Sequence, residues 1–371
     1  MKGGTERDLF RTAEGLRDLG HEIHLFCGEF GVPPPEGTRA HKVPYWPFGR
    51  TAGLLSFALA GPKVVRLQNC HIVVGFGRMI QQDILRSGGG THKLFLQRMQ
   101  GDMARSLWQR VSVYHQSVLA VERLQFRPGH YRKILAVSCE VKRDIMAAYG
   151  VPDERISVIY NGVDHDRFHP RHRSQAREKL RRQWGIPREA QVVLFVGSGF
   201  KRKGLDRLIR AWESPQLSGA YLLVVGDDAQ RSRYGAWAKS VAEGRILFTG
   251  RQKEIESYYG AADLLALPAL QEAFGNVVLE ALASGLPVLL SQEVGAAEIL
   301  EGELKQGVLM SPDDPAELAT MILSLLNPAR HQILSEKARK LGERYSWQNH
   351  FRALETYLLE DVEEARRGKI S

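Results

Sequence analysis

The stretch LPALQEAFGNVVLEALASGLPVLL, residues 267–290, decides the fold of this chain. It opens on the end of one short apolar run and closes inside a second, and runs of this length are typical of buried strands. Between them lie a loop carrying Glu272 and a short apolar segment that begins at about Asn276 and carries Glu280. A strand, a loop, a helix and a second strand in this order predict two parallel strands joined by a helical crossover.

Glu280 is the unusual residue of this stretch. It stands among Val277, Val278, Leu279, Ala281 and Leu282, so the predicted helix is apolar almost all round. A carboxylate in such surroundings is costly unless a partner stabilises it. We therefore expect a partner, which is either an arginine or a backbone amide of the protein, or a bound ligand.

The start of the same helix is a candidate anion site. Gly275 and Asn276 open the helix with unpaired backbone N–H groups and the positive end of its dipole. A sugar nucleotide bound there would place phosphate at these amides and its ribose beside Glu280, about one turn further on. Glu272, on the preceding loop, would then face the sugar.

These residues resemble the signature of family-4 retaining glycosyltransferases of the GT-B fold. The resemblance is strong over residues 156–312, and within the family it is greatest to the glucosyltransferases of the lipopolysaccharide core. It implies an α/β fold of two doubly wound, Rossmann-like domains facing a cleft, and transfer of glucose from UDP-glucose to a bacterial cell-surface glycan. The motifs that carry it are Glu272 and Glu280 as E-x7-E around Phe274-Gly275, Gly285-Leu286-Pro287-Val288, Val196-Gly197-Ser198, and Phe200 to Arg207.

The resemblance also assigns the donor site. Glu272 and the amides of Ala273, Phe274, Gly275, Asn276 and Val277 would bind the donor sugar and its phosphates, Glu280 the ribose, and the backbone near Arg251 the base. Many glycosyltransferases hold a metal with a D-x-D motif, and no convincing one is present. Arg202 and Lys203 offer cations for the diphosphate instead, so we expect neither a metal nor any other cofactor.

The charge of the chain is unevenly distributed. The 371 residues have a net charge of +9, and residues 1–165 hold 22 Lys and Arg against 15 Asp and Glu, which is +7. An anionic glycolipid or glycan acceptor, or an anionic membrane surface, fits this excess better than nucleic acid, because no nucleic-acid recognition motif is present.

Composition also bears on compartment. No apolar run approaches the roughly 20 residues that span a bilayer, the first residues do not resemble a signal peptide, and three isolated cysteines indicate no disulfide framework. We expect a cytoplasmic protein, which could work at the inner face of the cytoplasmic membrane.

Gly3 and Gly4 lead directly into a predicted helix. A doubly wound domain normally begins with a buried strand before such a turn. We therefore expect that the first strand of the N-terminal domain is missing and that the natural chain starts further upstream. In the resembling enzymes a Gly-Gly turn lies near the donor phosphates, which makes Gly3 and Gly4 candidate donor-binding residues.

A second glycine turn, Gly88-Gly89-Gly90, places His92 at a predicted helix start. In similar enzymes such a histidine reaches the hydroxyls of the donor sugar, and we assign that role to His92. The following segment, residues 93–127, is predicted to be helical. It is rich in arginine and aromatic residues, which would suit either core packing or lipid headgroups.

The predicted domains are residues 1–164 on the acceptor side, joined by a final helix over about 347–371, and residues 165–346 for the nucleotide sugar. Strands and helices alternate through the second domain, so its ligand is expected at the carboxyl ends of the strands. Two other functions stay open: a GT-B sugar-nucleotide epimerase, and an inactive nucleotide-binding homologue with a basic interaction surface.

Overall fold

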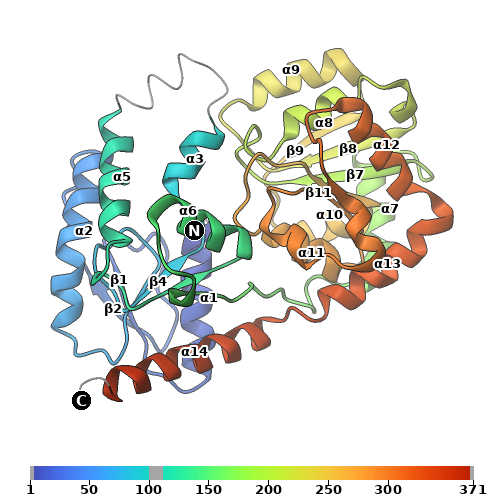
Figure 1. Ribbon diagram of the computed structural model, residues 1–371. Coiled ribbons are helices and arrows are strands. Elements are labelled where there is room, and N and C mark those ends of the chain that lie inside the picture. The colour runs from blue at the N-terminus through green and yellow to red at the C-terminus, as the bar shows by residue number, and fades with distance from the viewer. Residues whose placement is uncertain (1–3, 100–111, 368–371) are drawn as a thin grey trace. The chain divides into compact units, whose positions relative to one another are not determined.

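The computed structural model describes residues 4–99 and 112–367 and divides into two compact units. One comprises Met1–Tyr160 with Trp347–Ser371, and the other Asn161–Ser346. Each unit contains parallel strands covered by helices (Figure 1). No helix in the described part of the chain is long and apolar enough to cross a lipid bilayer.

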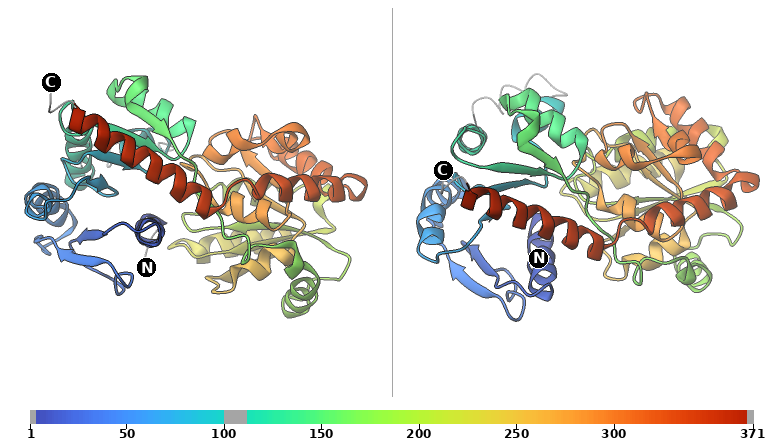
Figure 2. Two further views of the ribbon diagram at one scale, coloured as in Figure 1. Left: turned by 90° about the horizontal axis from the view of Figure 1, so that it is seen from below. Right: turned by 60° about the horizontal axis from the view of Figure 1, so that its bottom comes forward.

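The N-terminal unit contains two parallel sheets. The two-stranded sheet, blue in Figure 2, pairs β1 with β2. The four-stranded sheet has the order β3-β4-β5-β6. The strands are β1 (His24–Cys27), β2 (Arg39–Lys42), β3 (Val74–Gly75), β4 (Ile84–Ser87), β5 (Lys133–Ala136) and β6 (Ile156–Val158). The helices are α1 (Gly4–Asp18), α2 (Arg50–Arg66), α3 (His92–Arg98), α5 (Val113–Gln125), α6 (Cys139–Tyr149) and α14 (Trp347–Arg367), with the 3-10 turn η1 (Asp153–Arg155).

Two features of this unit were not predicted from the sequence. Strand β4 includes Arg86 and Ser87, directly before the glycine turn of residues 88–90. All four residues of β4 are buried, and the Arg86 guanidinium pairs with Asp8 at 3.0 Å, so a charged residue occupies a central strand. Residues 93–127 do not form one continuous described helix, because α3 ends at Arg98 and α5 begins at Val113.

The expectation that the first strand of this unit is missing stays a prediction. Helix α1 begins at Gly4, and Gly3 lies outside the described residues. In the described part of this unit, no strand pairs with both β1 and β3, so the two sheets stay separate.

Helix α14 packs its buried Leu354 and Leu358 against Leu16, Ile84 and Leu135 of the same unit.

The C-terminal unit has one parallel six-stranded sheet of order β12-β11-β10-β7-β8-β9. Its strands are β7 (Gln191–Val196), β8 (Ala220–Val225), β9 (Ile246–Gly250), β10 (Leu264–Leu267), β11 (Val288–Ser291) and β12 (Val308–Leu309). Its helices are α7 (Arg173–Gln183), α8 (Leu205–Ala211), α9 (Arg231–Ala242), α10 (Ile255–Ala261), α11 (Asn276–Ala283), α12 (Pro315–Leu326) and α13 (Pro328–Gly342), with 3-10 turns η2 (Pro170–His172), η3 (Pro215–Leu217), η4 (Gly295–Ile299) and η5 (Gly302–Gly307).

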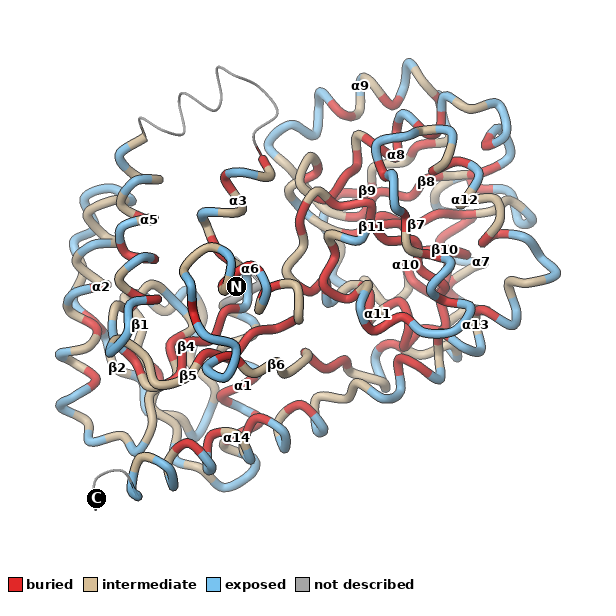
Figure 3. Tube along the Cα trace, viewed as in Figure 1, coloured by how far each residue is buried: buried red, intermediate tan, exposed pale blue. Residues whose placement is uncertain are grey.

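The core of this unit lies along the middle strands (Figure 3). Every residue of β10 and β11 is buried, and so are five of the six residues of β7. Helices cover both faces of a parallel sheet, so its central strands are continuous apolar runs rather than alternating ones. This is why the sequence predicts these strands well.

A buried ion cluster ties α7 to the sheet. The Asp263 carboxylate, just before β10, accepts from Arg173 at 3.0 Å, Arg177 at 2.6 Å and Arg181 at 2.9 Å, and it also accepts from the backbone N–H of Val192 at 2.9 Å. The three arginines are four residues apart and share one face of the helix. Three basic residues of α7 thus converge on one buried carboxylate of the sheet.

We predict that Asp263→Ala lowers the free energy of unfolding by about 3–5 kcal/mol, because Arg181 would stay buried without its carboxylate. Urea denaturation of the full chain measures this. The matched control is Glu178→Ala on the same helix, whose exposed pair with Arg182 should contribute less than about 1 kcal/mol. Equal losses in the two variants would contradict the assignment.

Candidate active site

The strand order of the C-terminal unit defines where its site lies. The chain runs from β7 outward to β8 and β9 on one side, then returns to β10, β11 and β12 on the other. Strands β7 and β10 are adjacent, and the loops that follow them lead to opposite sides of the sheet. This reversal is the topological switch point, where open α/β sheets bind ligands. Residues 197–204 and 268–275 form these two loops.

Two glycines allow the backbones at this switch point to approach closely. Gly204 has φ +78°, and a Cβ there would lie 1.9 Å from the carbonyl oxygen of Pro268. Gly226, after β8, has φ +139°, and its Cβ would lie 2.0 Å from the carbonyl oxygen of Gly197. Any larger side chain at either position would push the loops apart.

The two loops meet in a three-residue ion cluster. One carboxylate oxygen of Glu272, Oε2, accepts from Lys203 Nζ at 2.8 Å and from Arg202 Nη1 at 3.0 Å. Burial alone would raise the pKa of Glu272, but the charges of Lys203 and Arg202 outweigh that effect and lower this pKa to about 2. The cluster is therefore fully ionised at neutral pH and carries a net charge of +1.

Backbone hydrogen bonds fix the cluster from both sides. The amide of Leu270 donates to the carbonyl of Arg202 at 2.8 Å, and Arg202 Nη1 donates to the carbonyl of Gln271 at 2.7 Å. The backbone of Glu272 bonds to the segment after β11. Its amide donates to the carbonyl of Glu293 at 3.0 Å, and its carbonyl accepts from the amide of Gly295 at 2.9 Å. The cations and the carboxylate are thus preorganised without a ligand.

Helix α11 begins at Asn276, shortly after Glu272 in the chain. Gly275, with φ +93°, precedes its first residue, Asn276, which is exposed and whose side-chain oxygen accepts from Asn161 at 2.7 Å. Phe274 is buried and Ala273 and Val277 are half-buried, so a ligand here would meet the backbone of Phe274 rather than its ring. The structure places the expected anion-binding turn beside Glu272, in the same loop.

Glu280 has a partner, as its apolar helix requires, and one such partner is a tyrosine on the neighbouring helix. The hydroxyl of Tyr259, on α10, donates to Glu280 Oε2 at 2.5 Å. Tyr259 is fully buried, and burial together with the charge of Glu280 raises the pKa of its hydroxyl well above the usual value. No spacing rule connects α10 with α11, so no sequence pattern predicts this pair.

Arg251 follows β9 immediately and is exposed at the carboxyl end of that strand. It lies on the β8–β9 side of the switch point, whereas Glu272 and Glu280 follow β10. Gly250 before it has φ +74°, the conformation that turns the chain out of the strand.

His92, in the N-terminal unit, is the first residue of α3, as the sequence predicts. Its Nε2 lies 3.0 Å from His115 Nδ1, and the two rings are stacked. Burial and the nearby charge of Arg78 lower the pKa of His92 to about 4. The imidazole is therefore neutral at pH 7 and can both donate and accept hydrogen bonds.

The residue that positions His92 is Glu122, which the sequence analysis missed. Glu122 is 1% exposed and lies on α5. Its carboxylate accepts from the backbone N–H groups of His92 at 2.7 Å and Lys93 at 3.1 Å, from Arg78 at 2.7 Å, and from the Tyr149 hydroxyl at 2.5 Å. A carboxylate at the N-terminus of α3 complements the helix dipole and fixes the turn that carries His92.

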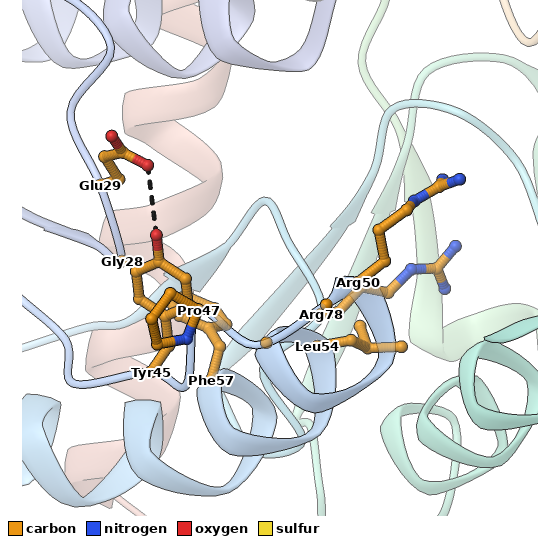
Figure 4. Close-up of a pocket in the computed structure, with 10 residues that line it drawn as sticks. Gly28, Glu29, Tyr45, Pro47, Arg50, Leu54, Phe57 and Arg78 are labelled. Atoms are coloured by element: carbon orange, nitrogen blue, oxygen red, sulfur yellow. Dashed lines mark hydrogen bonds between the residues drawn. The ribbon is translucent and has the colours of Figure 1, made fainter.

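A shallow pocket of about 610 Å³ opens in the N-terminal unit. Arg50 and Arg78 extend side by side at one end of it, and Glu29 bonded to Tyr45 lies at the other (Figure 4). The charge of Arg78 acts on His92 and that of Arg50 on His115, so this end of the pocket lies near the histidine pair. The remaining lining residues are Gly28, Pro47, Gly49, Gly53, Leu54 and Phe57.

The ion cluster predicts a specific pH dependence. The pKa of Glu272 is about 2 when folded and about 4.5 when unfolded, so the stability it adds is complete above about pH 5 and is lost as the pH falls toward 2. We expect the unfolding free energy of the native chain, relative to Glu272→Gln, to fall by about 2 kcal/mol between pH 7 and pH 3. Urea denaturation at each pH measures this free energy. The control is Glu301→Gln, which removes the acid of an exposed ion pair with Arg344 and should change the pH dependence of the unfolding free energy much less.

Comparison with known proteins identifies the family of the chain. Residues 2–167 match the family described as Glycosyltransferase Family 4, and residues 176–344 match Glycosyl transferases group 1. Lipopolysaccharide glucosyltransferase WaaG of Escherichia coli (strain K12) is 27% identical over 330 residues, covering 87% of this chain and 86% of the relative. D-inositol 3-phosphate glycosyltransferase of Corynebacterium glutamicum (strain R) is 27% identical over 373 residues, covering 92% and 81%.

Solved structures share the fold. The crystal structure of WaaG, a glycosyltransferase involved in lipopolysaccharide biosynthesis, matches with a TM-score of 0.80 at 24% identity and covers 96% of each chain. That of Anabaena Alr3699/HepE in complex with UDP-glucose matches with a TM-score of 0.70 at 22% identity, and each chain is covered to 97%. The chain therefore belongs to the glycosyltransferases of the GT-B fold, with a family 4 region in its N-terminal half and a group 1 region in its C-terminal half.

Proposed function

We propose that this enzyme transfers glucose from UDP-glucose, with retention of anomeric configuration and without a metal, to an anionic bacterial glycan of the lipopolysaccharide-core type. The observation that carries the proposal is the preorganised cluster of Arg202, Lys203 and Glu272 beside the start of α11. Its net positive charge suits a diphosphate. The likeness to WaaG, which is named as a lipopolysaccharide glucosyltransferase, supports the donor and the class of acceptor.

In this proposal the donor binds along the switch point of the C-terminal unit. The diphosphate lies at Arg202 and Lys203 and at the amides that open α11, the ribose hydroxyls bond to Glu280, and the backbone near Arg251 contacts the base. Arginine offers a planar fork and lysine a point charge to phosphate oxygens. Glu272 orients both cations and uses its remaining hydrogen-bonding capacity for the donor sugar.

The proposed chemistry requires no covalent intermediate. The bond between C1 of the sugar and the diphosphate oxygen breaks, and the acceptor oxygen bonds to C1 on the same face. The acceptor proton passes to the leaving phosphate oxygen, which gives UDP. Arg202 and Lys203 stabilise the negative charge that develops on the diphosphate. The role of His92 toward the hydroxyls of the donor sugar stays a prediction from the family resemblance.

The acceptor is assigned to the pocket of the N-terminal unit. Arg50 and Arg78 supply positive charge there, and Tyr45 and Phe57 supply aromatic surface. A relative named for an inositol phosphate acceptor supports a phosphorylated group at this position. We place the enzyme in the cytoplasm, at the inner face of the membrane that holds such acceptors.

The decisive experiment measures release of the nucleoside diphosphate from a panel of sugar nucleotides, with and without lipopolysaccharide-core acceptor, in the presence of EDTA. We expect acceptor-dependent release from UDP-glucose that EDTA does not reduce. Conversion of the donor into its sugar epimer without transfer would indicate the epimerase instead. Calorimetric binding of UDP-glucose without turnover would indicate an inactive homologue.

Removing one cation should impair catalysis more than folding. We expect Lys203→Ala to lower kcat by about 100- to 1000-fold, since one well-placed donor to developing charge contributes on the order of 3 to 4 kcal/mol. The control is Lys201→Ala, two residues earlier on the same turn and outside the ion cluster, which should keep most activity. Equal losses of activity in both variants, or a loss explained by a lower melting temperature, would contradict the role of Lys203.

A further inference from the structure

Tyr259, on α10, is a fully buried polar residue whose hydroxyl reaches the candidate donor site. Tyr259 is 1% exposed, whereas its partner Glu280, on α11, is half-buried. The hydroxyl donates to Glu280 Oε2 at 2.5 Å, a length typical of a hydroxyl bonded to a carboxylate. The tyrosine therefore contacts Glu280 from the protein interior, and the opposite, accessible side of Glu280 is the one that a ligand can reach.

The side chain of Tyr259 is itself held in place by the segment that precedes α7. The ring of Phe168 meets the ring of Tyr259 edge-on, with centroids 5.5 Å apart and planes at 88°. Arg167 lies over the Phe168 ring at 5.3 Å and pairs with Glu256 of α10 at 2.9 Å. The helix that carries Tyr259 is thus fixed on the side away from Glu280 as well, and the hydroxyl has one available direction.

The hydroxyl of Tyr259 keeps its proton. Burial, together with the charge of Glu280, raises the pKa of this hydroxyl well above its usual value, so it donates to Glu280 throughout the neutral pH range. A carboxylate with a fixed donor on one oxygen has one preferred orientation of its plane. The orientation of Glu280 is therefore set by a residue that no ligand touches.

We infer that Tyr259 is a positioning residue for the donor ribose, and that through Glu280 it makes the enzyme select ribonucleotides over 2′-deoxyribonucleotides. The inference deepens the proposed function and rests on one part of it, the bond between Glu280 and the ribose hydroxyls. A fixed acceptor rejects a ligand that lacks one hydroxyl, because the acceptor is then left unpaired in a site that excludes water. An acceptor that is free to turn would lose this selectivity, since it could bond equally well to the hydroxyl that remains.

Calorimetric titration of the full chain with UDP and with 2′-deoxy-UDP tests the inference. We expect the native chain to bind UDP about 10- to 100-fold more tightly than 2′-deoxy-UDP, the range for a hydrogen bond to a charged acceptor. Tyr259→Phe should reduce this preference at least about 5-fold, mainly through weaker binding of UDP. The substitution removes one oxygen and keeps the ring, and the melting temperature of the variant checks that it folds.

The matched control is Tyr258→Phe. Tyr258 is the preceding residue of α10 and is also buried, but its hydroxyl interacts with Thr249. The variant removes a buried hydroxyl from the same helix and should leave the preference for UDP unchanged. An unchanged preference in Tyr259→Phe, or the same loss in both tyrosine variants, would overturn the inference.

A double variant tests whether Tyr259 acts through Glu280. Glu280→Gln alone should lower the preference for UDP, and adding Tyr259→Phe should change it no further, because both substitutions affect one contact. A further loss in Tyr259→Phe/Glu280→Gln would show that the tyrosine acts by another route and would overturn the positioning role.

Kinetics with UDP-glucose distinguish positioning from general support of the fold. Tyr259→Phe should raise KM for UDP-glucose while kcat stays within about 3-fold of the native value, because the ribose contact lies away from the diphosphate cations. A loss confined to kcat, with KM unchanged, would contradict the role in ribose binding.

The nucleotide titrations also separate this inference from the proposed function. Selectivity for UDP that depends on Tyr259, without any transfer of glucose, would refute the proposed function and retain the role of Tyr259. Transfer from UDP-glucose with a UDP preference that is insensitive to Tyr259 would refute the positioning role alone. Absence of binding of both nucleotides to the native chain would refute both.

Discussion

The pairing of Glu272 with Lys203 and Arg202 is the constraint on which the C-terminal unit depends. A carboxylate at this depth would take up a proton if the two cations were removed, and two cations this close would repel each other without the carboxylate. The group is stable only when loops from two neighbouring strands meet. Gly204 permits that approach, and the reversal of strand order at β7 and β10 brings the loops to one edge.

The same solution recurs in the N-terminal unit. Glu122 is a buried carboxylate whose charge is balanced by Arg78 and by the N-terminus of α3. It holds His92 in place and, with burial, Arg78 lowers the pKa of that histidine, so the ring stays neutral. In each unit a carboxylate therefore fixes the position of the groups around it: half-buried Glu272 holds Lys203 and Arg202, and buried Glu122 holds the turn that carries His92. The two cations of the C-terminal unit suit the anionic donor and product of the proposed function.

The structure shows which basic residues of the N-terminal half are paired with acids and which are exposed. Part of the basic excess is used internally, as in the pairs of Arg98 with Asp144 and Arg86 with Asp8. The exposed lysines and arginines of this half are distributed over several elements, among them Arg11, Lys63 and Arg127. Net charge alone indicated an anionic partner, but it could not distinguish cations that hold the fold from cations that are open to a partner.

Several features of this protein follow from sequence alone because they depend on local patterns. The apolar runs of the C-terminal strands, the glycine turns and the helix start at His92 are set by burial on both faces and by backbone freedom, which neighbouring residues reveal. The grouping of Arg202 and Lys203 with Glu272, about 70 residues apart, was expected through a family resemblance and not from spacing. Only the tertiary structure decided that Tyr259 bonds to Glu280, that Glu122 carries His92, that α7 converges on Asp263, and that Arg86 lies in a strand. Each of these is a buried polar group satisfied by a partner distant in the chain, and the energy of such a contact depends on where the fold excludes water, which no local pattern encodes.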